Sequence, residues 1–160
     1  MSFPNRFRTV LVLAMALAVF GGVLVAKEAS MDWASGEYTG SRDEVLTLMG
    51  FYDSIELTAE QEAVRQEALG PLPAACCNEF SMATCCCVCN LSRSIWGLSK
   101  HLIAERGASA EVVRKSVEAW VAAINPDGYQ GKTCTTGQCG KPFKEGGCGG
   151  MNPNHLVHSD

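Results

Sequence analysis

The sequence predicts a mainly α-helical protein, with an N-terminal membrane-spanning or signal helix, a small cysteine-rich helical bundle and an irregular Gly/Cys-rich tail. Three observations predict it: an uncharged N-terminal stretch, amphipathic segments between helix caps and breakers, and a dense run of cysteines. The predicted boundaries are 1–26 for a signal anchor or signal peptide, 27–40 for a linker, 41–128 for the helical cysteine-rich domain and 129–160 for the tail.

The N-terminal stretch has the features of a membrane-targeting segment. Arg6 and Arg8 precede residues 9–26, which contain eighteen residues and no charge. A run of this length is just long enough to cross a bilayer as a helix, and basic residues ahead of it favour a cytoplasmic N-terminus. We therefore expect residues 9–26 to bind the membrane and the domain to be extracytoplasmic, either periplasmic or extracellular. The domain would be secreted if the segment is cleaved. Cleavage stays open, because a cleavage site favours small residues and Ala26 is small, whereas Leu24, two residues before it, is bulky.

The charge of the chain excludes some classes of partner. The whole chain carries a net charge of -4, and residues 1–26 contain two arginines and no acid, so the exported part is more acidic still. An acidic domain without a basic stripe is a poor partner for nucleic acid, and no phosphate-binding loop or nucleophile elbow is present. His101 falls on the polar side of its predicted helix, so we expect a solvated surface histidine.

Two short helices are predicted before the cysteine run. Ser41 and Glu44 have the spacing of a capping box, and the apolar residues after them predict a helix that ends before Gly50. Residues 58–61 repeat the capping pattern and begin a second helix. That helix is expected to end at Gly70, because a proline follows it.

A helical hairpin is predicted after the cysteine run. Apolar side chains recur at helical spacing in 95–103, and either Asn90 or Ser92 can cap that helix. The same periodicity recurs in 113–124 after a cap at Ser109. The apolar faces of these helices must be buried against each other or against the upstream helices, so a small bundle is expected.

The nine cysteines are the most informative feature of the sequence. Six of them fall within fourteen residues, and the other three lie in the tail. A disulfide framework is the ordinary expectation for an exported protein. However, cysteines adjacent in sequence are expected to point apart and to need distant partners, and an odd number leaves at least one thiol unpaired.

Clustered thiolates also suit a soft metal ion, copper or zinc, because several sulfurs can converge on one ion. The tail cysteines would then complete the site or hold the tail over it, and another exported thiol or metal protein is the expected partner. The candidate metal ligands are Cys76, Cys77, Cys85, Cys86, Cys87, Cys89, Cys134, Cys139 and Cys148.

A third interpretation is thiol redox chemistry by Cys86 and Cys89. They form a Cys-x-x-Cys motif just before a predicted helix, whose N-terminus stabilises a thiolate. Cys86 would attack and Cys89 would resolve, which would make the protein a thiol-disulfide oxidoreductase. Metal binding, redox chemistry and purely structural disulfides all stay open at this point, and with them whether the protein is an enzyme.

Residues 86–124 resemble the thiol-bearing domain of the CcmH family of cytochrome c maturation proteins. Cys86-Cys87-Val88-Cys89 is similar to the family's cysteine pair, and residues 107–111 are similar to its glycine turn. The resemblance implies an exported, membrane-tethered three-helix bundle in which Cys86 and Cys89 are functional. The chain differs in having Ala83-Thr84-Cys85 where the family has Leu-Arg before its first cysteine. It also resembles small bacterial cysteine-rich proteins named for a PCYCGC motif, although that motif is absent.

Overall fold

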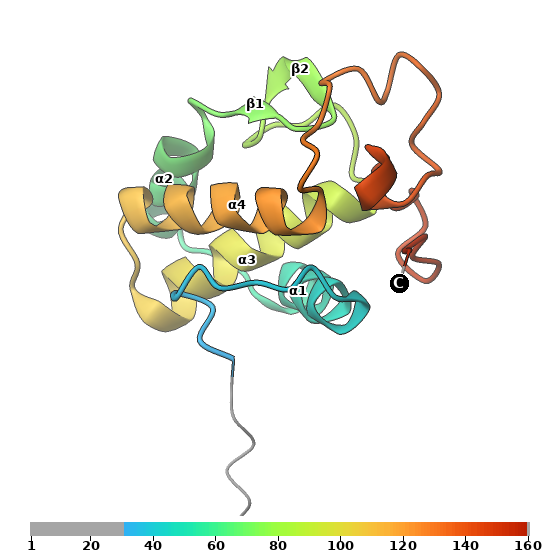
Figure 1. Cartoon of the computed structure of the whole chain (residues 1–160). Coiled ribbons are helices and arrows are strands. Elements are labelled where there is room, and N and C mark those ends of the chain that lie inside the picture. The colour runs from blue at the N-terminus through green and yellow to red at the C-terminus, as the bar shows by residue number, and fades with distance from the viewer. Residues whose placement is uncertain (1–30, 160) are drawn as a thin grey trace, which may run out of the picture. The chain divides into compact units, whose positions relative to one another are not determined.

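The computed structural model of this protein describes residues 31–159. Four α-helices, one short antiparallel hairpin and a 3-10 helix make up this part of the chain (Figure 1). The prediction of a mainly helical fold is confirmed. The elements are α1 (Arg42–Ser54), α2 (Ala59–Leu69), β1 (Pro73–Ala74), β2 (Cys77–Ser81), α3 (Asn90–Arg106), α4 (Ala110–Ile124) and η1 (Phe143–Glu145).

The predicted capping boxes are present at the starts of α1 and α2. The hydroxyl oxygen of Ser41 accepts a hydrogen bond from the Glu44 amide at 3.3 Å, and Thr58 caps α2 in the same way. Helix α1, however, passes through Gly50 to Ser54 instead of ending before the glycine. One glycine costs a helix only about 1 kcal/mol. The continued turn stacks Phe51 on His101, with ring centroids 4.3 Å apart.

Helix α3 starts differently from the prediction. Its N-cap residue is Cys89, whose side chain makes no capping hydrogen bond. The two predicted caps lie inside the helix and bind other groups. The amide of Asn90 donates to backbone carbonyls of the tail, and the hydroxyl of Ser92 donates to the carbonyl oxygens of Cys87 and Cys89.

Helix α3 is the centre of the bundle and packs against the other three helices (Figure 1). Gly97 allows the close approach of α1, because a Cβ atom at this position would overlap the carbonyl oxygen of Leu48. On the side of α4, the fully buried Trp120 donates its indole N–H to the hydroxyl of Ser94 at 3.1 Å.

Residues 31–40, predicted as part of a linker, pack onto the bundle instead. Trp33 is 6 % exposed, and its carbonyl oxygen accepts the Tyr38 hydroxyl at 2.6 Å. The Tyr38 ring meets Trp120 edge-on, with centroids 5.6 Å apart. Aromatic side chains bury large areas, which explains why this polar-looking segment is held.

The predicted membrane segment at 9–26 and the first part of the linker lie outside the described residues. Over residues 31–159, no helix combines the length and the apolar character needed to cross a bilayer.

The tail is an ordered layer beside the start of α3 and the hairpin (Figure 1). Phe143, Cys148 and Leu156 are buried, although they show no regular spacing in the sequence. The backbone amides of Asn90 and Leu91 donate to the carbonyl oxygens of Gly150 and Cys148 at 3.0 and 3.1 Å. The first turn of α3 therefore provides the partners that the tail needs to fold.

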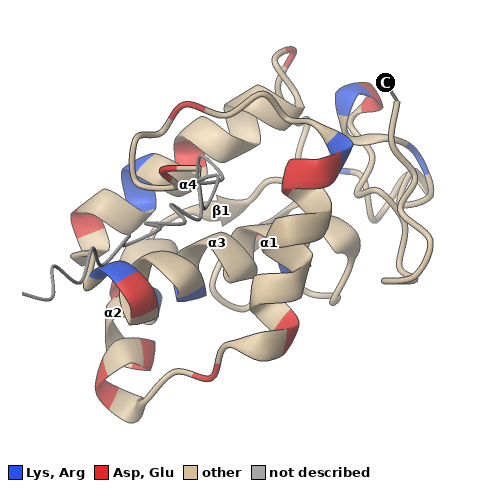
Figure 2. Cartoon of the chain, turned by 90° about the horizontal axis from the view of Figure 1, so that it is seen from below, with Lys and Arg blue, Asp and Glu red and all other residues tan. Residues whose placement is uncertain are grey.

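Acidic and basic residues alternate along the ribbon of the helices (Figure 2). Lys115 pairs with Glu111 at 2.8 Å, and Arg106 pairs with Asp32 at 2.8 Å.

His101, predicted to be solvated, is half-buried against Phe51, and this burial lowers its pKa.

Candidate metal centre

Seven of the nine cysteines lie where three segments of the chain meet. These segments are residues 76–78 at the start of β2, the loop 82–89 and the tail at 131–134. The amide of Asn78 donates to the Gly131 carbonyl at 3.1 Å, and that of Thr133 donates to the Cys76 carbonyl at 2.9 Å. This antiparallel pairing places the tail cysteine Cys134 next to the start of β2.

One set of sulfurs, called the outer group here, consists of Cys77, Cys86 and Cys134. Their three sulfur atoms all lie within 4.8 Å of one another, and those of Cys86 and Cys134 are 3.6 Å apart. Sulfurs that share one ion at about 2.3 Å are about 3.8 to 4.0 Å apart. Cys77 is buried and Cys86 is exposed, so the outer group lies at the surface with one open side.

A second set, called the loop group here, consists of the consecutive residues Cys85, Cys86 and Cys87. Their sulfurs also lie within 4.8 Å of one another, and those of Cys86 and Cys87 are 3.9 Å apart. The expectation that consecutive cysteines point apart is therefore wrong for this run. The reason is that the loop turns and bends here instead of running as an extended strand.

The same expectation holds for Cys76 and Cys77. The Cys77 sulfur belongs to the outer group, whereas the Cys76 sulfur lies 3.9 Å from that of Cys85. Cys76 lies in the turn between β1 and β2, whereas Cys77 is the first residue of β2, and this change of backbone direction separates the two sulfurs.

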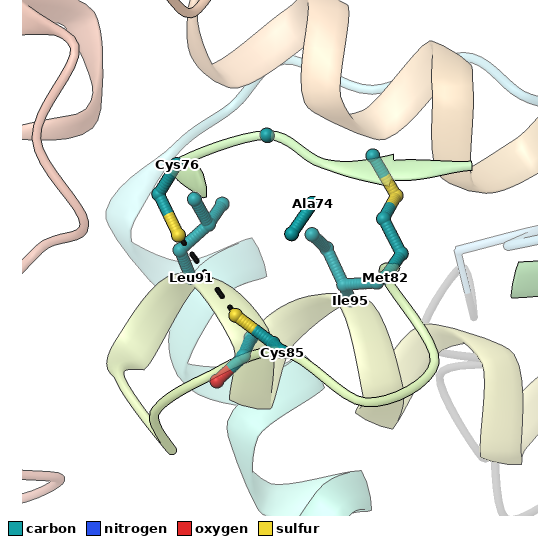
Figure 3. A pocket seen from close by; sticks show the side chains of 8 residues that line it. Ala74, Cys76, Met82, Cys85, Leu91 and Ile95 are labelled. Atoms are coloured by element: carbon teal, nitrogen blue, oxygen red, sulfur yellow. Dashed lines mark hydrogen bonds between the residues drawn. The ribbon is translucent and has the colours of Figure 1, made fainter. Parts of the chain in front are cut away.

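A third set of sulfurs, called the inner group here, is buried below the loop and consists of Cys76, Cys89 and Cys148. They are 1 %, 0 % and 0 % exposed. Cys89 shares hydrogen bonds with both Cys148 and Cys76. Figure 3 shows Cys76 and Cys85 facing each other at one end of a cavity of about 10 Å³, which is room for about one water molecule. Most of the remaining lining is apolar and includes Ala74, Leu91 and Ile95, and Ser92 also lines the cavity.

Hydrogen bonds between the sulfurs shift their pKa values in opposite directions. The hydrogen bonds from Cys148 and Cys76 lower the pKa of Cys89, and the hydrogen bond from Cys76 lowers the pKa of Cys85 to about 7. The pKa values of the donor thiols rise. Hydrogen bonding to Cys85 and Cys89 raises the pKa of Cys76, and hydrogen bonding to Cys89 raises the pKa of Cys148. The thiolate form is thus favoured at Cys85 and Cys89. Burial raises the pKa values of Cys86, Cys87 and Cys134, so a metal ion that binds these sulfurs must displace their protons.

The nine candidate ligands do not converge on one point. Five of them make up the outer and loop groups, and three make up the inner group. Cys139 belongs to none of these groups, and its sulfur is 4.0 Å from the carbonyl oxygen of Thr133. The structure distributes the candidate ligands over neighbouring smaller groups, and Cys134 and Cys148 of the tail each join one of them. All nine cysteines carry free thiols in the structure.

The Cys-x-x-Cys residues Cys86 and Cys89 belong to different groups. The Cys86 sulfur is exposed and contacts Cys87 and Cys134, whereas the fully buried Cys89 contacts Cys76 and Cys148. Cys89 does lie directly before α3, as the redox interpretation requires. Its sulfur, however, interacts with those of Cys76 and Cys148.

Two residues near the sulfurs have roles that the sequence did not indicate. The buried hydroxyl of Tyr129 has no hydrogen-bond partner within the described chain and lies close enough to Cys76, Cys89 and Cys148 to interact electrostatically. Asn90 holds the tail that carries Cys134 and Cys148. No local pattern indicates either role, because both depend on where the tail docks.

The outer and loop groups consist of cysteine alone, without histidine or carboxylate. Such all-sulfur sets suit soft ions, which favour thiolate over oxygen ligands. Comparison with family models, curated proteins and solved structures gave no match for this chain.

Proposed function

We propose that this protein binds a soft metal ion, Cu(I), through the thiolates of the outer group. The observation that carries the proposal is the convergence of Cys77, Cys86 and Cys134 from three separate segments, with all their sulfurs within 4.8 Å of one another. Ordinary packing does not require three thiols to meet at a surface. The 3.6 Å separation of the Cys86 and Cys134 sulfurs is close to that of sulfurs that share one ion.

The number of ligands favours Cu(I) over zinc. A structural zinc site takes four ligands in a closed tetrahedron, whereas the outer group supplies three sulfurs. Thiolate ligands suit both ions, but Cu(I) is stable with fewer ligands than zinc. A zinc ion in the outer group would need a fourth donor from elsewhere.

The exposure of the outer group supports a role in metal transfer. Because Cys86 is exposed, a thiol of a second protein can approach the ion and displace one ligand at a time. We propose that the N-terminal segment at 9–26 anchors the chain in a membrane, with the sulfur groups on the extracytoplasmic side. The basic residues before this segment support that orientation.

The experiment is a competition titration of the full chain in mild detergent, reduced and kept without oxygen. Cu(I) is divided between the protein and a chromogenic Cu(I) chelator, and zinc is tested in parallel. Cys134→Ser should weaken Cu(I) binding at least about tenfold, since it removes one of three ligands. The matched control Cys139→Ser, outside all three groups, should bind as the unmodified chain does. Equal Cu(I) affinity in the Cys134→Ser variant and the unmodified chain would contradict the proposal.

Thiol redox chemistry is a second candidate, and the geometry favours Cys76 and Cys85 for it. Their sulfurs are 3.9 Å apart, and Cys85 has a pKa lowered to about 7 by its hydrogen bond with Cys76. In this reaction the two thiols reduce a substrate disulfide to two thiols and become a disulfide themselves. Cys85→Ser should abolish the exchange with oxidised glutathione, whereas Cys134→Ser should keep it.

A further inference from the structure

The outer group and the loop group share one residue, Cys86. Its sulfur lies within 4.8 Å of those of Cys77 and Cys134 in the outer group and of those of Cys85 and Cys87 in the loop group. We infer that Cys86 is a bridging thiolate that holds two Cu(I) ions in one binuclear cluster, one ion in each group. This inference rests on the proposed function and adds the number of ions and the ligand that joins them.

The number of sulfurs fits this arrangement. Two three-coordinate ions that share one ligand need five sulfurs, and the two groups together contain five: Cys77, Cys85, Cys86, Cys87 and Cys134. A thiolate sulfur carries more than one free electron pair, so it can bind two ions at once. The contacts of Cys86 at 3.6 Å to Cys134 and 3.9 Å to Cys87 place one ligand of each ion next to the bridge.

The same count argues against a pair of zinc ions. Two four-coordinate ions that share one ligand need about seven donors, two more than the groups supply. The nearest further sulfur is that of Cys76, 3.9 Å from Cys85, and it is directed into the buried inner group. The five-sulfur set is therefore matched to ions that accept three ligands.

The surroundings are suited to the charge of such a cluster. Five thiolates and two Cu(I) ions leave a net charge of about -3, which needs nearby positive groups or hydrogen-bond donors. The backbone amide of Cys87 donates to the Cys85 sulfur, and α3 begins at Asn90 with the positive end of its dipole toward the loop. Lys132 lies opposite Cys77 in the antiparallel pairing, and directly opposed side chains of such a pair lie on the same face.

The test combines native mass spectrometry with copper X-ray absorption on the full chain in detergent, loaded without oxygen. The unmodified chain should bind two copper ions and show scattering of one copper by the other. Cys86→Ser should remove the copper–copper scattering. Cys134→Ser and Cys87→Ser should each retain one ion, and Cys139→Ser should behave as the unmodified chain. Because Cys86 is exposed, serine fits there without repacking, and circular dichroism checks the fold of each variant.

The failures of the two proposals are distinguishable. A chain that binds one copper ion, or two without copper–copper scattering, overturns the bridge but keeps Cu(I) binding. Copper–copper scattering that persists in Cys86→Ser also overturns the role of Cys86. A chain that binds no Cu(I) overturns the proposed function itself.

Discussion

The sulfur atoms of Cys86 and Cys134 lie 3.6 Å apart, although 48 residues separate them in sequence. The contact exists because the tail pairs with residues 76–78 and docks on the first turn of α3. A loop closure of this length is entropically unfavourable unless other contacts hold it. The proposed metal centre therefore depends on residues that contain no sulfur.

Asn90 is expected to control metal affinity from outside the cluster. Its fully buried amide donates to the carbonyl oxygens of Gly149 at 2.9 Å and Asn152 at 3.1 Å. Asn90→Ala leaves both carbonyls without this donor, and a lost buried hydrogen bond costs about 1 to 3 kcal/mol. We expect faster proteolysis of the tail and Cu(I) binding about tenfold weaker, because a loosened tail presents Cys134 less often. Limited proteolysis and the chelator competition measure the two effects.

The control for this variant is Asn154→Ala, because Asn154 is an exposed tail residue. It should change neither proteolysis nor Cu(I) affinity. If Asn90→Ala binds Cu(I) as tightly as the unmodified chain, the tail does not need this anchor to deliver Cys134.

Gly97 is expected to be intolerant of a methyl group. In Gly97→Ala the added Cβ would overlap the Leu48 carbonyl oxygen, so α1 and α3 must move apart. Alanine favours a helix by about 1 kcal/mol, but overpacking of a tight interface costs about 1 to 3 kcal/mol or more. We expect a lower free energy of unfolding in urea.

The matched control is Gly50→Ala in α1. A Cβ there meets nothing within 4 Å, so the helix propensity acts alone and should raise the free energy of unfolding by about 1 kcal/mol. Opposite signs for the two glycines are the expected result. Stabilisation by both would show that α1 and α3 are not closely packed at Gly97.

The hydrogen bond between Trp120 and Ser94 is expected to stabilise the core. The indole N–H is buried and donates to the Ser94 hydroxyl at 3.1 Å. Ser94→Ala leaves this donor unsatisfied, which should lower the free energy of unfolding by about 1 to 3 kcal/mol. Chemical denaturation followed by tryptophan fluorescence measures it. Ser54→Ala, at an exposed helix end, should change the value by less than about 0.5 kcal/mol.

His101 is expected to make the fold less stable in mild acid. Burial against Phe51 lowers its pKa in the folded chain, whereas the unfolded value is about 6.5. As the pH falls below about 6.5, the unfolded chain binds the proton more readily, so folding stability decreases until the lower folded pKa is passed. His101→Gln should reduce the loss of stability between pH 7.5 and pH 5.

The measurement is the free energy of unfolding at each pH, compared between the variant and the unmodified chain. Taking this difference removes the contribution of the cysteine thiols, which is common to both. His155→Gln, at an exposed tail position, is the control. An unchanged pH dependence in His101→Gln would show that burial of this ring is not linked to stability.

Local sequence signals predicted most of the helices. Capping patterns at Ser41, Thr58 and Ser109 mark true helix starts, and Gly107 ends α3 in a left-handed conformation with φ of 60°. These signals succeed because a cap is formed by groups within about four residues. The glycine signal gave a wrong end for α1 at Gly50. There the packing of the next helical turn outweighs the small cost of glycine to helix stability.

The sequence by itself determined that the protein is mainly helical, rich in thiols and supplied with three cysteines in a glycine-rich tail. Only the tertiary structure decided which sulfurs meet. It separated Cys86 from Cys89, joined Cys86 to Cys134 and placed Cys148 beside Cys89. The physical reason is that helix caps depend on neighbouring residues, whereas sulfur partners depend on the register of a long loop closure, which no local pattern encodes.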